Sequence, residues 1–263
     1  MLIDNISVVI IVKNAENTLD NTLKSLSAFT EVILYDNGSR DKSLDIARSY
    51  ANVNLVQGTF IGFGPTKNKA ASFAKNDWIL SLDADEVLTQ GFMEGLEKSF
   101  DASSKHIVYN INRKNFYRER EIKYCWKNEK VVRLYAKDKT QFNDNEVHEK
   151  VCSDMMDIAT IDGFVNHYSY ATVSDFIVKI ERYSTLFALE KRGNKHSSPL
   201  KATLNALYSF LKTYIFKRGF LDGYPGLLIS FSHMTGNFYK YMKLYEANLE
   251  LKQSTNKEKI DEI

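Results

Sequence analysis

The fold is decided by a short apolar stretch near the start of the chain, ISVVIIV at residues 6–12. Its β-branched residues follow one another with little polar alternation, a pattern typical of a strand buried on both faces of a parallel sheet. Helices and strands are then expected to alternate in the order helix 14–26 with Asn14 as N-cap, strand 31–36, helix 41–51, strand 52–58, helix 66–75 and strand 78–86. This order predicts an α/β domain on a parallel sheet with right-handed crossovers.

The alternation weakens after about residue 100. Further strands are expected at 106–117 and 130–138, followed by amphipathic helices at 173–191 and 200–216. We therefore expect two parts, a catalytic domain at 1–170 and a helical, aromatic and basic region at 171–263.

The segment 223–239 contains no Asp, Glu, Lys or Arg. It is interrupted by Pro225, Gly226, His233 and Gly236, so we expect it to form loop and core rather than a helix. The polar tail from Lys252 is expected to fray.

The composition excludes several classes of protein. The chain has 263 residues, of which 44% are hydrophobic and 26% charged, which is ordinary for a soluble globular protein. A net charge of +2 gives no support for nucleic-acid binding. The sequence has no stretch of about 20 apolar residues, the length that a bilayer-spanning helix needs.

The start of the chain does not resemble a signal peptide, because Asp4 stands where a basic region belongs and the apolar run 8–12 is too short. Two cysteines, Cys125 and Cys152, cannot form a disulfide framework or a cysteine zinc site. Reduced thiols fit a cytoplasmic location, which we expect.

The strongest chemical motif is Asp83-Ala84-Asp85 at the end of a predicted buried strand. Strand alternation would turn both aspartates to the same side, at the sheet edge where open α/β folds bind ligands. Two converging carboxylates repel each other unless a cation neutralises them, and oxygen ligands suit Mg²⁺ or Mn²⁺. The alternative is a solvated acidic turn.

Asp36 closes a second strand and precedes Asn37-Gly38-Ser39. Its carboxylate there would accept hydrogen bonds from a ribose or a base, or it would simply cap an Asx turn. The chain has neither the Gly-x-Gly-x-x-Gly motif of dinucleotide folds nor a P-loop. A nucleotide would therefore be held by carboxylates and a metal.

The three segments ISVVIIVKNAENTL, EVILYDNGSRDKS and GPTKNKAASFAKNDWILSLDADE together resemble the family 2 glycosyltransferases of the GT-A fold, over residues 6–90. Later motifs, Val147-His148-Glu149 and His167-Tyr168-Ser169-Tyr170, look like the branch that adds β-glucose to the lipopolysaccharide inner core. The resemblance implies a Rossmann-like mixed sheet with a helical C-terminal extension.

The resemblance also implies roles in binding a UDP-sugar donor. The base pocket would be lined by Ile11 to Asn14, including Lys13, with Glu16 nearby. Asp36 would bind the uracil or the ribose, and Lys67, where the family usually has arginine, would serve the base or diphosphate. Asp83 would contact the ribose or the metal, with Ala84 beside it. Asp85 would coordinate a Mg²⁺ or Mn²⁺ ion. His167 would be a third metal or diphosphate contact, or else a half-buried core histidine.

The reaction needs a base that removes the acceptor proton while the hydroxyl attacks C1 from the opposite face, which inverts the anomeric centre. The candidates are Asp144, Glu146, His148 and Glu149. We predict Glu149 as the base with His148 as an orienting group. The alternative for this segment is a solvated charged loop.

The acceptor is expected to involve the basic and aromatic part of the chain after residue 170. Such a surface would rest on an anionic membrane, or its aromatic stripe would be simple helix packing. Arg113, Lys114, Arg118 and Arg120 would meet phosphates on a lipid-linked glycan acceptor.

Two other functions stay open. A nucleotidyltransferase also pairs carboxylates on an α/β sheet, but usually has a Gly- and Arg-rich loop after the first strand, where this chain has Lys13-Asn14. A non-enzymatic protein that binds sugar nucleotides would have the same fold.

Overall fold

A computed structural model describes residues 2–126, 128–144 and 149–261. The chain forms two compact units, one of residues 1–115 and 128–169, and one of residues 116–127 and 170–263. The second unit thus begins one residue before the expected boundary and also takes in the segment 116–127.

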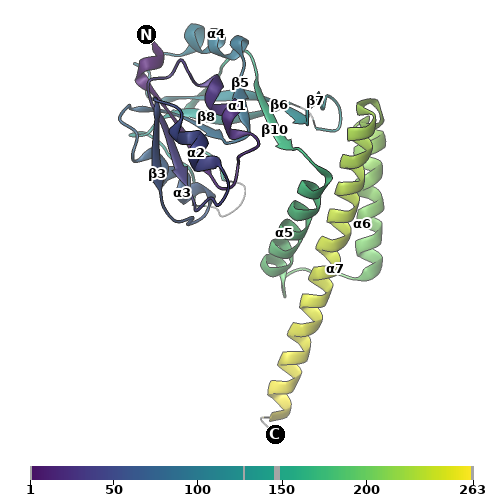
Figure 1. The fold of residues 1–263 in the computed structure, drawn as a ribbon. Coiled ribbons are helices and arrows are strands. Elements are labelled where there is room, and N and C mark those ends of the chain that lie inside the picture. Colours follow the sequence, from purple (N-terminus) through teal and green to yellow (C-terminus); the bar gives the residue numbers. More distant parts are fainter. Residues whose placement is uncertain (1, 127, 145–148, 262–263) are drawn as a thin grey trace. The chain divides into compact units, whose positions relative to one another are not determined.

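The first unit is an α/β domain (Figure 1). Its elements are η1 (Leu2–Asn5), β1 (Ile6–Val12), α1 (Leu19–Ser25), β2 (Val32–Asp36), α2 (Ser43–Arg48), β3 (Val53–Gln57), α3 (Phe63–Ala71), β4 (Trp78–Asp83), β5 (Glu86–Leu88), α4 (Gln90–Ser99), β6 (Ile107–Tyr117), β8 (Glu129–Ala136), β9 (Asp157–Thr160) and β10 (Val165–Tyr170). The last residues of β6 and β10 belong to the second unit.

The sheet is mixed, in the strand order β3-β2-β1-β4-β8-β6-β10-β5. The strands β3, β2, β1 and β4 are parallel, as the alternating pattern predicted, whereas β8 is antiparallel to both β4 and β6. The predicted α/β class with a mixed nucleotide-binding sheet is therefore confirmed.

Two apolar cores cover the two faces of this sheet. On one face, residues of α1 and α4 such as Leu19, Leu23 and Phe92 pack on β1 and β4. On the other face, Ala70 of α3 and Phe142 pack against Val9 and its neighbours. Burial on both faces explains why the parallel strands are apolar almost without interruption.

The first helix starts later than the sequence predicted. α1 begins at Leu19 with Thr18 as its N-cap, and Asn14 instead has a left-handed backbone with φ 54°. The residues between them form a loop at the end of β1.

The second unit is helical. It contains β7 (Arg120–Glu121), α5 (Val173–Lys191), α6 (Pro199–Leu211), the π-helical turn η2 (Lys212–Phe216), the 3-10 helix η3 (Gly219–Asp222) and α7 (Tyr224–Asp261). Both α5 and α6 pack along α7 (Figure 1). The described part of the chain has no helix that is both long and apolar enough to cross a membrane.

The expectation of loop and core at 223–239 was wrong, because α7 runs through this segment and continues to Asp261, within the tail from Lys252 that was expected to fray. Pro225 lies in the first turn, where a missing N–H costs nothing. At Gly226 a Cβ would lie 1.8 Å from the carbonyl oxygen of Gly219, so this glycine permits close packing on η3 and does not end a helix.

The segment 116–127 is fastened to the helices by the buried Asp222. Its carboxylate accepts hydrogen bonds from the backbone N–H groups of Lys123, Tyr124 and Cys125, at 2.9 to 3.3 Å. This contact explains why an insertion in the sheet domain belongs to the helical unit.

The imidazole of His233 makes this unit sensitive to acid. Its Nε2 accepts from the Trp126 indole at 3.4 Å and its Nδ1 contacts the Thr213 hydroxyl at 3.0 Å. Burial, aided by Lys217, lowers the pKa of His233 to about 4. Between about pH 6.5 and 4 the unfolded chain therefore binds a proton that the folded chain does not, so stability falls as the pH falls.

We expect the free energy of unfolding to drop by about 2 kcal/mol more between pH 7 and pH 5 in the wild type than in His233→Gln. Denaturant titration at both pH values measures this difference. The exposed His196 of the same unit supplies the control, since His196→Gln should behave as the wild type does. Equal pH dependence in all three proteins would contradict the prediction.

Candidate active site

Two of the expected donor-binding aspartates end strands that flank β1. Asp36 is the last residue of β2 and pairs with Val12, and Asp83 is the last residue of β4 and pairs with Ile11. Because the strands are parallel, both carboxylates lie at the same edge of the sheet. The candidate site is built on this edge.

The Asp36 side chain is buried and bonded within its own turn. It accepts from the backbone N–H groups of Gly38 at 3.0 Å and Ser39 at 3.1 Å. Gly38 has φ 87°, which favours glycine. The Asx-turn interpretation is therefore confirmed, and the contact of Asp36 with a donor stays a prediction.

The loops after β1 and β2 are bound to each other. Asn14 Oδ1 accepts from the backbone N–H of Arg40 at 2.8 Å, and Glu16 Oε2 accepts from that of Lys42 at 3.1 Å. Lys13 is exposed beside them. Asn14 and Glu16 thus hold the edge of the site together, which sequence spacing alone did not indicate.

Asp83 is held by two cations. Its Oδ1 lies 3.0 Å from Lys67 Nζ and its Oδ2 lies 3.1 Å from Arg133 Nη2. Burial by itself would raise the pKa of Asp83, but Lys67, Arg133 and His167 outweigh it and hold this pKa well below its usual range. Asp83 is therefore a carboxylate at all physiological pH values.

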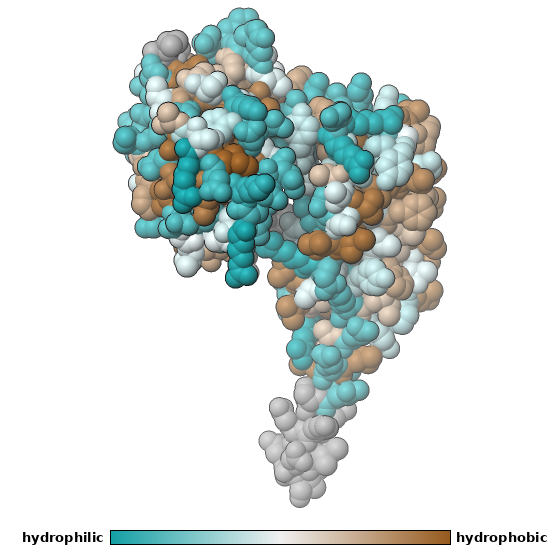
Figure 2. All heavy atoms as spheres, in the orientation of Figure 1, coloured by the Kyte–Doolittle hydropathy of each residue, from teal (hydrophilic) through white to brown (hydrophobic). Residues whose placement is uncertain are grey.

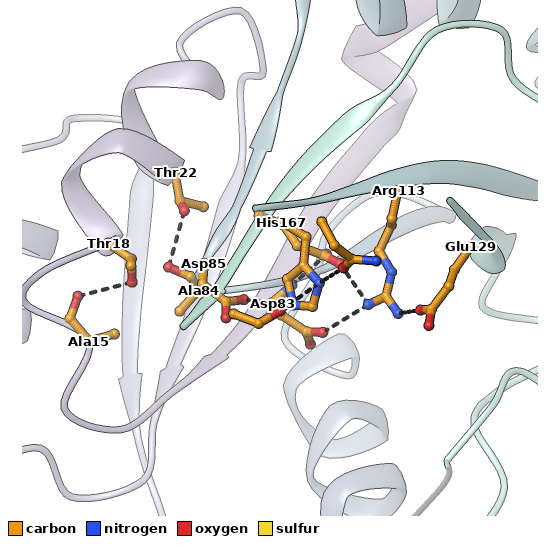
Figure 3. Close-up of polar contacts among 12 residues, drawn as sticks. Ala15, Thr18, Thr22, Asp83, Ala84, Asp85, Arg113, Glu129 and His167 are labelled. Carbon is orange, nitrogen blue, oxygen red and sulfur yellow. Dashed lines mark hydrogen bonds and ion pairs between the residues drawn. The ribbon is translucent and has the colours of Figure 1, made fainter. Parts of the chain in front are cut away.

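A second ion-pair group, formed by Glu86, Arg113 and Glu129, contacts the backbone of Asp83. The backbone N–H of Asp83 donates to Glu86 Oε2 at 2.9 Å, and Glu86 Oε1 lies 3.1 Å from Arg113 Nη1. Arg113 also pairs with Glu129 (Figure 3). Burial alone would lower the pKa of Arg113, but Glu86 and Glu129 raise it above its usual value. Arg113 thus belongs to this ion-pair group, and its contact with acceptor phosphates stays a prediction.

Asp85 lies apart from the Asp83 ion pairs. β4 ends at Asp83 and the chain turns at Ala84 and Asp85, so strand alternation does not continue through the motif. The backbone oxygen of Ala84 accepts from the Thr22 hydroxyl at 3.1 Å, and Asp85 Oδ1 lies 3.6 Å from His167 Nε2. Figure 3 shows His167 reaching over Asp85 from β10.

The His167 ring is oriented by its other nitrogen. Nδ1 lies 2.9 Å from Asn115 Oδ1, and the Ser169 hydroxyl lies 2.9 Å from each ring nitrogen, so the ring is held with Nε2 on the side of Asp85. An imidazole held in this way is the usual arrangement of a metal-binding histidine.

A divalent cation fits Asp85 and His167 better than it fits the three residues that the sequence suggested. Among the described residues, no group of three or more His, Cys, Asp or Glu side chains is placed to hold a metal ion. Asp83 is engaged with Lys67 and Arg133, so it does not complete such a group. Mg²⁺ is commonly held by one or two carboxylates and completes its shell with phosphate oxygens and water. Asp85 would supply one such carboxylate, with His167 beside it.

The candidate base Glu149 is brought to the same edge by a loop. Phe142 and Val151 form an isolated antiparallel β-bridge. The Asn68 side chain of α3 donates a hydrogen bond to the Phe142 carbonyl and accepts one from the Phe142 N–H, both at 2.9 Å. Glu149 Oε1 then lies 2.9 Å from Lys67 Nζ. Asp144 is exposed, and the other two candidates, Glu146 and His148, lie outside the described residues.

Two residues of this site stand in no recognisable sequence motif. They are Arg133, which is buried in β8, and Glu86, the buried partner of an arginine. A cation within the otherwise apolar run VVRLYA was the available indication for Arg133. Its partner, Asp83, is separated from it by 50 residues, so only the pairing of β4 with β8 reveals the contact.

Lys67 is expected to stabilise the fold as well as the site. Its side chain is only 3% exposed and joins Asp83 to Glu149, so a donor diphosphate would reach it only by displacing a carboxylate. Lys67→Met should lower the free energy of unfolding by about 2 kcal/mol. This loss is smaller than the loss from breaking a fully buried ion pair, because Asp83 still has Arg133 as a partner. Denaturant titration measures the loss. Lys69→Met, an exposed lysine on the same helix, is the control, and equal stability of the two variants would contradict the prediction.

Comparison with solved structures finds the 1–349 fragment of S. aureus TarS in complex with UDP-GlcNAc, at a TM-score of 0.42 and 14% identity, covering 95% of this chain and 92% of that chain.

Comparison by sequence finds clearer relatives. An uncharacterized glycosyltransferase of Rickettsia typhi is 30% identical over 93% of this chain and 88% of its own length. The lipopolysaccharide core biosynthesis glycosyltransferase LpsC of Rhizobium meliloti is 24% identical over 92% of this chain and 93% of its own length. The family model described as glycosyl transferase family 2 matches residues 7–159, more than half of the chain. With the mixed GT-A sheet and the D-x-D motif at the end of β4, these matches establish that the chain belongs to glycosyl transferase family 2.

Proposed function

We propose that the protein transfers a hexose, with inversion, from a UDP-sugar to a hydroxyl of a glycan acceptor. The observation that carries this proposal is the position of Lys67, whose ammonium lies 3.0 Å from Asp83 and 2.9 Å from Glu149. One lysine thereby holds the D-x-D strand end and a candidate base at the same edge. A donor bound at the strand ends would have a carboxylate at hand for the acceptor.

The donor would lie along the carboxyl ends of β1, β2 and β4. Asp36 and the backbone of Ile11 to Asn14 would receive the uridine, and Asp83 would accept a hydrogen bond from the ribose. A Mg²⁺ or Mn²⁺ ion held by Asp85 and His167 would neutralise the diphosphate so that it can leave. Asn115 would keep the His167 ring turned toward that position.

Glu149 would take the proton of the acceptor hydroxyl as it attacks C1. The Lys67 ammonium, 2.9 Å away, would hold this carboxylate at the edge of the sheet where the acceptor hydroxyl arrives. The side chain is 16% exposed, so the base is largely shielded from water while still reachable. His148 as an orienting group remains part of the proposal.

For the acceptor we propose a lipopolysaccharide core or a related phosphorylated glycan, and for the sugar we propose glucose. The name of the Rhizobium meliloti relative supports the first choice. In the helical unit, a pocket of about 380 Å³ is lined by Tyr117, Arg118, Glu119, Arg120, Tyr224 and Pro225. Arginine side chains of this kind bind phosphate groups, and the tyrosines offer flat surfaces for sugars.

A lipid-linked acceptor would place the enzyme at a membrane. We propose a cytoplasmic enzyme that associates peripherally with the inner face, in keeping with the basic and aromatic character of residues 171–263.

Release of UDP from UDP-glucose, UDP-galactose and UDP-GlcNAc, with Mn²⁺ and with EDTA, tests the proposal. We expect metal-dependent turnover with one of these donors, and an inverted anomeric configuration in the product by NMR. Thermal-shift measurements with UDP-, GDP- and TDP-sugars identify the nucleotide, because a bound ligand raises the melting temperature. Binding without turnover toward any acceptor would favour a non-enzymatic sugar-nucleotide-binding protein, and pyrophosphate release from a nucleoside triphosphate would favour a nucleotidyltransferase.

A further inference from the structure

The helix α6 has its large apolar side chains on the outside. Its buried residues are Ala202 and Ala206, which are small. Leu200, Leu204 and Leu207 are 69%, 57% and 52% exposed. A helix that merely packs on its unit shows the opposite distribution, with leucines inside and polar residues outside.

The exposed leucines form one continuous stripe. At about 100° per residue, the side chains at positions 200, 204, 207, 208 and 211 fall within roughly a third of the helix circumference. We call this stripe the α6 face, and its members are Leu200, Leu204, Leu207, Tyr208 and Leu211, all exposed, with the exposed Ile215 following in η2. Beyond its end, Phe216, Phe220 and Leu221 are exposed as well. Figure 2 shows hydrophobic residues gathered on the surface of the helical unit.

Helix packing was the alternative for the aromatic residues of this region, and it holds for Phe210, whose ring lies 5.0 Å from that of Phe231 on α7. The leucines of the α6 face do not pack in this way, because α6 contacts α7 through its alanine side. An apolar stripe of this extent on a protein surface marks an interaction site.

Basic residues border the α6 face. By the same rotation Lys201 lies at its edge, and Lys212, Lys217 and Arg218 follow the end of α6, within and just after the π-helical turn η2. Residues 191–245 contain nine lysines and arginines but a single acid, Asp222, which is buried and bonded to backbone N–H groups. Since the whole chain carries only +2, its positive charge is concentrated in this unit.

This combination selects an anionic lipid surface as the partner. Leucine and aromatic side chains insert at the boundary between headgroups and acyl chains, while lysine and arginine stems extend to the phosphates. A second copy of the chain would instead bring two sets of like charges together around the apolar stripe.

We propose that the α6 face docks the enzyme on a bilayer containing anionic lipids. The inference rests on the proposed function only in its purpose, which is to bring the enzyme to a lipid-borne acceptor. Docking itself needs neither donor nor acceptor, so its failure would leave the transferase proposal untouched.

The test is co-sedimentation of the full chain with two kinds of vesicle. One is phosphatidylcholine alone, and the other contains about 30% phosphatidylglycerol, which gives a strongly anionic surface. We expect binding to the anionic vesicles that is at least about tenfold stronger than to the neutral ones, and that weakens in high salt. The variant Leu204→Ser, Leu207→Ser, Leu211→Ser should lower the partition coefficient by about tenfold or more. The variant Lys212→Glu, Lys217→Glu, Arg218→Glu should lower it by about 100-fold.

Matched variants in the sheet unit control for general changes of hydropathy and charge. Met155→Ser with Ile158→Ser removes exposed apolar side chains, and Lys42→Glu with Lys98→Glu and Lys139→Glu reverses three exposed charges. Both should bind vesicles as the wild type does. Circular dichroism shows whether each variant is folded, and donor binding gives a second check that is independent of the helical unit.

Two results would overturn the proposal. The first is vesicle binding that is absent, or that the variants of the α6 face leave unchanged. The second is a dimer in light scattering that the leucine variant converts to a monomer, since the face would then be a contact between copies of the chain.

Discussion

Replacing Asp85 by alanine is expected to lower kcat by on the order of 1,000-fold and to remove the metal dependence of UDP binding. Asp85 Oδ1 lies 3.6 Å from His167 Nε2, and these two side chains are the ones to which we assign the metal. A metal at a departing diphosphate contributes several kcal/mol, which corresponds to this loss of rate. Initial rates and calorimetric titration of UDP with and without Mn²⁺ measure the two effects.

Asp83, the other aspartate of the motif, should respond to substitution differently from Asp85. Because Asp83 is paired with Lys67 and Arg133, Asp83→Asn should destabilise the protein while leaving some metal-dependent UDP binding. Asp154→Ala, an exposed site in the same unit, should change neither property. If Asp85→Ala kept full turnover and full metal dependence, the metal role assigned to Asp85 and His167 would be wrong.

The second large effect is expected at Glu149. Glu149→Gln should lower kcat by about 100- to 10,000-fold, the usual contribution of a general base, while the Kd of UDP stays within about twofold. Glutamine keeps an oxygen for the hydrogen bond from Lys67 but cannot take the acceptor proton. Steady-state transfer assays and UDP titration separate the two quantities.

Glu97→Gln tests whether any such change at a glutamate has an effect, because Glu97 is exposed on α4. This variant should be as active as the wild type. Normal transfer by Glu149→Gln would show that Glu149 is not the base, and would leave Asp144, Glu146 and His148 as the candidates. A parallel loss of UDP binding would instead show that Glu149 acts by holding Lys67 in place.

The α/β class, the parallel strands and the sheet edge that carries the candidate site can all be predicted from the sequence alone. These follow from local patterns, because a strand buried on both faces must be apolar along its length, and ISVVIIV and WILSLD satisfy that requirement. The carboxylates that end β2 and β4 were identified for the same reason, since a polar residue directly after such a strand leaves the core at the ligand-binding edge.

The pairing of the charged side chains, in contrast, is visible only in the folded chain. Antiparallel pairing of β4 with β8 brings Arg133 to Asp83, and the loop bonded to Asn68 brings Glu149 to Lys67. These contacts join residues separated by up to 82 positions in the sequence. The same limit applies to α6. Its periodicity predicts an apolar stripe, but not whether that stripe packs against another helix or is exposed to solvent. Periodicity fixes which residues share a face, whereas the partner of that face depends on contacts between elements that are distant in sequence.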